Sequence, residues 1–108
     1  MTNEYGVRLD SNGYAPSVVE PFDTGMCFAC GVGGDLARHE IFFGPNRATS
    51  KALGCWVYLC KGCHDNVHGH VGSLDRQLKK IAQMRAMSHY GWSATDFRRR
   101  FGKSYVEE

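Results

Sequence analysis

Cys27-Phe-Ala-Cys30 and Cys60-Lys-Gly-Cys63 are the two stretches that decide how this chain folds. Structural zinc takes four ligands in a tetrahedron, and a two-residue spacer lets one turn of the chain present two thiolates to the same ion. Residues 31–59 separate the two pairs and are long enough to form a hairpin that brings the second pair back to the first. The sequence therefore predicts one closed, structural Zn2+ site formed by Cys27, Cys30, Cys60 and Cys63.

Composition favours metal binding over disulfide formation for these cysteines. The chain has 108 residues, enough for one compact domain, with 43% hydrophobic and 22% charged residues. No apolar run approaches the roughly 20 residues of a membrane span, and residues 1–6 lack a secretory signal pattern, so we expect a cytoplasmic protein without membrane contacts. Paired cysteines in a reducing compartment are more often metal ligands than disulfides. Redox dithiols are the alternative, but neither pair has the strand–helix setting of a thioredoxin-like motif.

The sequence predicts a small α+β fold. We expect strands at residues 36–43 and 55–59, with a short helix capped by Asn46 between them at residues 46–53. A helix capped by Ser73 should follow at residues 73–90, and a last helix opened by a Ser93–Asp96 capping box at residues 93–101. We expect an extended N-terminal arm at residues 1–25 and a zinc-bound core at residues 26–71. Residues 72–108 should form a basic helical extension of the same domain.

A second cluster of metal-ligand residue types accompanies the cysteines. His64 follows the last cysteine directly and His68 lies four residues later. Residues i and i+4 of a helix share a face, so both imidazoles can reach one divalent ion. His39 and Glu40 lie in the first predicted strand. If the strands pair and the helix packs across them, all four residues meet at one site.

Charge is unevenly distributed along the chain. Residues 1–23 contain four acidic residues against one arginine, whereas residues 72–103 contain eight basic residues against two acidic ones. A basic segment favours a polyanionic partner, and a solvated helix face is the alternative.

Two groups of residues are candidate contacts to the phosphates of such a partner. Arg98, Arg99 and Arg100 lie between two phenylalanines, which fits a helix that docks its aromatic rings on the core and turns arginines toward a phosphate backbone. Asn46 and Arg47 follow the first predicted strand and are candidate phosphate contacts, with helix capping and surface charge as the alternative roles.

At these residues the sequence resembles the HNH endonucleases. The resemblance is carried by His39-Glu40-Ile41-Phe42-Phe43-Gly44, Asn46-Arg47, Ser50, Gly54 and Val57-Tyr58-Leu59-Cys60-x-x-Cys63-His64-x-x-x-His68. The chain is most similar to small phage-encoded members with two Cys-x-x-Cys pairs, over about residues 27–68. The resemblance implies a zinc-stapled, treble-clef-like ββα-metal core that binds one further divalent ion such as Mg2+ and cuts or nicks DNA, in the bacterial host cell if phage-encoded.

The resemblance also implies roles for individual residues. His39 matches the metal ligand that begins the family's histidine pair, and Glu40 falls where the family usually has the histidine that activates water. His64 and His68 match the helix positions that complete the metal site. Cys55, or the glycine before it, replaces the family's middle asparagine. A one-residue slip of register would exchange the roles of His39 and Glu40, so these residues are predicted as a set.

The function expected from the resemblance is metal-assisted phosphodiester hydrolysis of DNA, in which His39 or Glu40 activates water. Two other functions fit the same sequence. One is a non-catalytic zinc module of the same fold that binds nucleic acid, and the other is a zinc-stapled protein-interaction domain. The sequence leaves open the oligomeric state and whether a protein partner directs the chain to its substrate.

Overall fold

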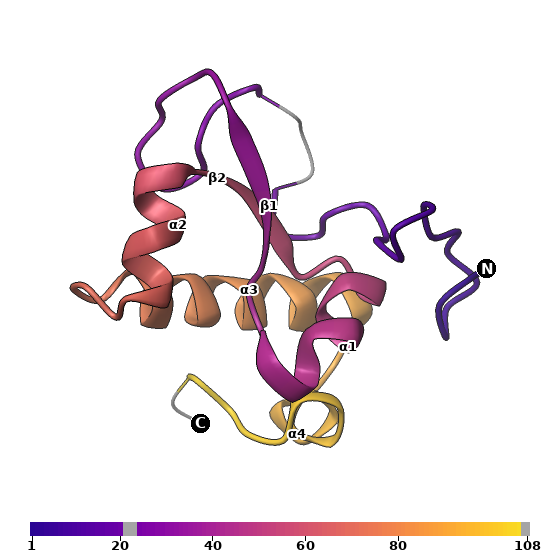
Figure 1. The fold of residues 1–108 in the computed structure, drawn as a ribbon. Coiled ribbons are helices and arrows are strands. Elements are labelled where there is room, and N and C mark those ends of the chain that lie inside the picture. The colour runs from indigo at the N-terminus through magenta and orange to yellow at the C-terminus, as the bar shows by residue number, and fades with distance from the viewer. Residues whose placement is uncertain (21–23, 107–108) are drawn as a thin grey trace.

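Two short antiparallel strands lie at the centre of the molecule, with helices on both sides of the hairpin (Figure 1). The computed structural model describes residues 1–20 and 24–106. Its elements in chain order are β1 (Leu36–Glu40), the 3-10 turn η1 (Gly44–Asn46), α1 (Arg47–Ala52), β2 (Trp56–Cys60), α2 (Lys61–His68), α3 (Leu74–Tyr90) and α4 (Ala94–Phe101). The predicted α+β class is confirmed.

The register of the hairpin places the site residues of β1. His39 lies opposite Val57, and Glu40 lies opposite Trp56. Successive side chains of a strand point to opposite faces, so His39 and Glu40 leave β1 in different directions. Both are nevertheless buried, with 1% and 8% of their surface exposed. The two neighbours therefore meet different partners.

The first strand is shorter than predicted. The expected range was 36–43, but β1 ends at Glu40. The Phe42 N–H donates to the Ser50 hydroxyl at 3.2 Å instead of to the partner strand, which turns the chain into η1. The helix expected beyond Cys63 begins earlier, at Lys61, because Cys60 serves as its N-cap.

All three predicted helix caps occupy N-cap positions, but only one makes side-chain capping bonds. The Ser93 side chain accepts from the Asp96 N–H, and the Asp96 carboxylate accepts from the Ser93 N–H, which completes the capping box of α4. Asn46 and Ser73 occupy N-cap positions, but their side chains make no capping bond. The Asn46 amide donates to the last carbonyl of α4 at 3.0 Å, and the Ser73 hydroxyl accepts from the Gln77 amide at 2.8 Å.

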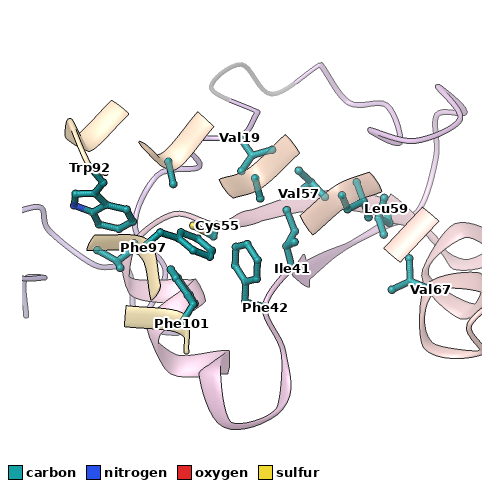
Figure 2. Packing of buried hydrophobic residues seen from close by; sticks show 14 of the residues in the cluster. Val19, Ile41, Phe42, Cys55, Val57, Leu59, Val67, Trp92, Phe97 and Phe101 are labelled. Atoms are coloured by element: carbon teal, nitrogen blue, oxygen red, sulfur yellow. The ribbon is translucent and has the colours of Figure 1, made fainter. Parts of the chain in front are cut away.

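Aromatic residues join α4 to the hairpin. Phe42 lies 4.5 Å from Phe101 and 5.2 Å from Phe97 between ring centroids, and Figure 2 shows the three rings pointing toward one another. Both phenylalanines of α4 are buried, as predicted for a helix that docks its aromatic face on the core. Burial of each ring contributes about 1.5–3 kcal/mol of hydrophobic free energy.

Hydrogen bonds hold the N-terminal arm to Ala52 and Trp56 of the domain. The Asn3 amide donates to the Ala52 carbonyl at 2.8 Å, and the Trp56 indole N–H donates to the Ala15 carbonyl at 2.7 Å. The Ser17 hydroxyl donates to the Trp56 carbonyl at 2.6 Å. Parts of the predicted arm and extension, 21–23 and 107–108, lie outside the described residues.

In the described part of the chain, no helix combines the length and the apolar character needed to cross a membrane.

Candidate metal centres

The four cysteines of the predicted zinc site come together at one end of the hairpin. Cys27 and Cys30 lie in a tight turn, whereas Cys60 ends β2 and Cys63 lies in the first turn of α2. The four sulfurs lie within 4.8 Å of one another, and the Cys30 and Cys60 sulfurs are 3.7 Å apart. A tetrahedral ion with Zn–S bonds of about 2.3 Å separates its sulfurs by about 3.8 Å. These four cysteines could therefore hold one zinc ion.

Backbone geometry aims the sulfurs inward. Gly31 has a φ of +80°, a left-handed conformation that glycine adopts at no steric cost. Its N–H donates to the Cys27 carbonyl at 2.8 Å, which closes the first turn. In the second turn the Cys63 N–H donates to the Cys60 sulfur at 3.5 Å. Each Cys-x-x-Cys pair thus forms one turn with its sulfurs on one side.

Two of the four cysteines have shifted pKa values, in opposite directions. Burial opposes ionisation of Cys27, but backbone N–H groups of Cys60, Cys30 and Ala29 outweigh it and lower the pKa of Cys27 to about 6. Burial, and then hydrogen bonds with the neighbouring cysteines, raises the pKa of Cys63 to about 12. The protein alone therefore favours the thiolate form of Cys27 and the neutral thiol form of Cys63. A bound divalent cation would supply the charge that stabilises all four.

Three histidines form a second cluster beside β1. The nearest ring nitrogens of His39, His64 and His68 lie within 4.8 Å of one another, and the Nε2 atoms of His64 and His68 are 3.2 Å apart. A tetrahedral ion with metal–nitrogen bonds of about 2.1 Å separates its nitrogens by about 3.4 Å. The spacing fits a metal site, although a hydrogen bond between the two imidazoles of α2 also explains the 3.2 Å separation.

The Nε2 atom of His39 is a buried polar atom at this cluster. His39 is 1% exposed, and its Nε2 is buried without a hydrogen-bond partner among the described residues. A buried polar atom without a partner destabilises a fold by about 1–3 kcal/mol. The ring lies 5.3 Å from His64 and 5.4 Å from His68 between centroids. A metal ion bound between the three rings would satisfy this nitrogen.

The surroundings of His39 and His64 favour their neutral form. Burial, followed by the charges of His64 and His68, lowers the pKa of His39 to about 4. Burial also lowers the pKa of His64, with the neighbouring His68 as the next cause. Neutral imidazole is the form that ligates metals. These shifts favour the ligating form of His39 and His64 at neutral pH.

Glu40 lies outside the histidine cluster and is held by two donors. Its Oε1 accepts from Arg47 Nε at 2.5 Å, and its Oε2 accepts from the Tyr14 hydroxyl at 2.7 Å. Burial opposes ionisation of Glu40, but the hydrogen bonds from Tyr14 and Arg47 outweigh it, so the pKa lies below its ordinary value. Glu40 is thus an ionised acceptor with both oxygens engaged.

One cleft of about 570 Å³ contains both the histidines and Glu40. It is lined by Tyr14, Arg38, His39, Glu40, Phe43, Gly44, Arg47, His64 and His68. Sequence reasoning missed Tyr14 and Arg38. Arg38 precedes Glu40 by two residues and so shares its strand face, which is a usable signal. Tyr14 reaches the cleft from the arm, and nothing in its local sequence indicates this.

The other predicted DNA contacts lie elsewhere. The lining of this cleft does not include Asn46 or the three arginines of α4, all of which are described residues. Arg99 pairs with Asp96 at 3.2 Å, and Arg100 pairs with Glu4 at 2.8 Å. Arg98 donates to the Thr95 hydroxyl at 3.2 Å.

Comparison with protein-family models, with curated proteins and with solved structures gave no match. The likeness to the HNH endonucleases therefore rests on the motif residues quoted above.

Proposed function

We propose that the chain is an HNH-like, metal-dependent endonuclease that hydrolyses phosphodiester bonds of DNA. The observation that supports it best is the convergence of His39, His64 and His68 in a cleft that also contains two arginines. The buried and unpartnered Nε2 of His39 indicates a ligand in that cleft. Phosphate is the ligand chemistry that a metal ion and planar guanidinium groups bind together.

The histidines also suggest which metal the site takes. His39, His64 and His68 would hold the ion, and the set contains no carboxylate. Imidazole suits zinc, nickel, copper and iron, whereas Mg2+ prefers oxygen ligands. We therefore propose a transition-metal ion in place of the Mg2+ that the family resemblance first implied. When bound, the ion supplies Lewis-acid stabilisation of the charge on the scissile phosphate.

Arg47 and Glu40 are the residues that bind phosphate and accept a proton in this proposal. The Arg47 side chain is 64% exposed and faces the cleft from α1, while Glu40 fixes its guanidinium. An incoming phosphate competes with Glu40 for Arg47. Release of Arg47 removes one of the hydrogen bonds that lower the pKa of Glu40. The freed Oε1 then accepts a proton from the attacking water, with Tyr14 holding the other oxygen.

The test is nicking of supercoiled plasmid by the purified protein with Mn2+, Ni2+, Zn2+ or Mg2+. We expect metal-dependent nicking that His64→Ala and His68→Ala each abolish while the structural zinc is retained. His89→Ala is the matched control, because His89 is an exposed histidine of α3 outside the cluster. Nicking that survives both substitutions, or no nicking with any metal, contradicts the proposal.

A second candidate function is a DNA-binding module of the same fold that does not cleave. The observation that favours it is Glu40, whose two oxygens are both occupied in the structure. Salt-dependent DNA binding without cleavage under every metal supports this function. Absence of both binding and cleavage supports the protein-interaction domain instead.

A further inference from the structure

Three hollows adjoin on one side of the molecule. The histidine cleft shares Tyr14 and Arg38 with a second hollow of about 380 Å³, which the N-terminal arm lines with Arg8. It shares Gly44 and Arg47 with a third hollow of about 380 Å³, which α1 lines with Lys51. Neighbouring hollows share lining residues, so the three adjoin, and together they are called the groove. Tyr14 and Arg47, which are shared with the two outer hollows, both bind Glu40, so these hollows meet the histidine cleft beside Glu40.

Basic side chains outnumber acidic ones along this groove. Its described lining contains four cationic side chains, Arg8, Arg38, Arg47 and Lys51, and two carboxylates, Asp10 and Glu40. Arg38 pairs with Asp10 at 2.6 Å, and Arg47 pairs with Glu40. Arg8 and Lys51 have no acidic partner among the described residues, and they lie in the two outer hollows. The uncompensated charge therefore lies in the two hollows that adjoin the histidine cleft beside Glu40.

Tyr14 of the arm organises the centre of the groove. The Arg38 guanidinium lies 4.4 Å from the centroid of the Tyr14 ring, and the Lys51 ammonium lies 4.7 Å from it. Cation–π contacts of this kind hold a charged group in place while leaving its donors available. The Tyr14 hydroxyl is anchored on Glu40. One arm residue thus fixes cations from β1 and α1 around the cleft.

The basic helix α4 is organised differently. Arg99 and Arg100 pair with Asp96 and Glu4, and the Arg100 guanidinium lies 4.4 Å from the Trp92 ring centroid. These contacts fasten the arm and the helix start to the domain. Arg99 and Arg100, which the sequence analysis predicted as DNA contacts, therefore stabilise the fold.

We infer that DNA binds along this groove, with the N-terminal arm as one wall and with Arg8 and Lys51 contacting phosphates next to the Glu40 end of the histidine cleft. The inference rests on the proposed function, since it identifies the DNA surface of the same site. It adds the arm, which the motif resemblance does not cover.

The experiment measures DNA affinity without cleavage. His68→Ala protein with its structural zinc is the parent, and binding to a short fluorescein-labelled duplex is measured by anisotropy between about 50 and about 200 mM salt. The groove variant carries Arg8→Gln and Lys51→Gln. Its matched control carries Arg76→Gln and Lys80→Gln, which remove the same charge from exposed positions of α3. A third variant carries Arg98→Gln and Arg99→Gln on α4.

The expected result is a change in salt dependence for the groove variant. Each lost phosphate contact reduces the magnitude of the slope of log K against log salt by about 1. The slope of the groove variant, which lacks two contacts, should therefore be smaller than that of the parent by about 2. The α3 control should keep the parent slope. Equal losses in groove variant and control, a larger loss in the α4 variant, or a parent that does not bind DNA overturns the inference. If the groove variant does not fold, the single variant Arg8→Gln at an exposed position should have a slope smaller than that of the parent by about 1.

This outcome is separate from that of the proposed function. Nicking by wild-type protein with an unchanged slope in the groove variant refutes the groove and leaves the endonuclease standing. Loss of slope without any nicking refutes the endonuclease and leaves the groove standing.

Discussion

Gly54 tests how the N-terminal arm is held against the domain, because substitution by alanine combines two separate penalties there. Gly54 has a φ of +77°, which destabilises an alanine by about 1–2 kcal/mol. An added Cβ would also overlap the Pro16 carbonyl oxygen and lie 3.1 Å from the Val18 nitrogen. Backbone atoms at these distances must shift, so the arm has to move away from the domain.

The size of the second penalty follows from the bonds around this contact. The Val18 N–H donates to the Gly54 carbonyl at 2.9 Å, and the arm shares two further hydrogen bonds with Trp56 through Ala15 and Ser17. At about 1 kcal/mol each, loss of these three bonds adds about 3 kcal/mol. Gly54→Ala should therefore lower the free energy of unfolding by about 4–5 kcal/mol.

Gly91→Ala is the matched control for backbone conformation. Gly91 has a similar φ of +71°, but a Cβ there would meet nothing within 4 Å. It should lower the free energy of unfolding by about 1–2 kcal/mol only. Urea unfolding followed by circular dichroism compares the variants, and limited proteolysis shows whether residues before 20 are released. Equal destabilisation by both substitutions would refute the packing of the arm described above.

Three further predictions concern the core, the arm and the zinc site. Phe42→Ala should lower the free energy of unfolding by about 3–5 kcal/mol in urea denaturation, because Phe42 is 1% exposed and packs on α4; a loss below about 1 kcal/mol contradicts this. The hydrogen bond from Arg38, and then the Tyr14 N–H, lowers the pKa of Asp10 to about 2. Arg38→Gln should therefore raise the pKa of Asp10 toward 3.8 in an NMR titration, and an unchanged pKa contradicts the contact. Since the folded pKa is lowered, stability from Asp10 is full above pH 3.8 and is lost as the pH falls through about 2. Cys60→Ser should lower the zinc content measured by elemental analysis by one ion per chain, whereas Cys55→Ser should keep the wild-type content, because Cys55 is buried away from the other four; equal zinc loss in both contradicts the assignment.

The sequence was most informative where a fixed spacing carries geometry. Two-residue spacers between cysteines and the four-residue spacing of His64 and His68 restrict the side chains to one turn or one helix face. The four-cysteine cluster, the capping box of α4 and its buried phenylalanines followed from such local rules. The contacts of Asn46 and Ser73 did not, since a distant carbonyl and a nearby glutamine competed successfully for their side chains.

The surroundings of the candidate site depended on long-range packing. Tyr14 lies 26 residues before Glu40 in the chain, yet its hydroxyl holds the Glu40 carboxylate. No periodicity or motif in the arm indicates that contact. Likewise, nothing local shows that Arg100 is taken up by Glu4, 96 residues away. Charge counts along a sequence therefore located basic residues but did not separate those that stabilise the fold from those that line the cleft.

The most direct test of the account is the number of metal ions that one chain binds. Native mass spectrometry of protein loaded with excess Zn2+ and desalted should detect two ions per wild-type chain and one per chain of the His64→Ala/His68→Ala variant, which should remain folded. A single ion in both proteins would contradict a metal site at His39, His64 and His68, and would remove the main support for an endonuclease.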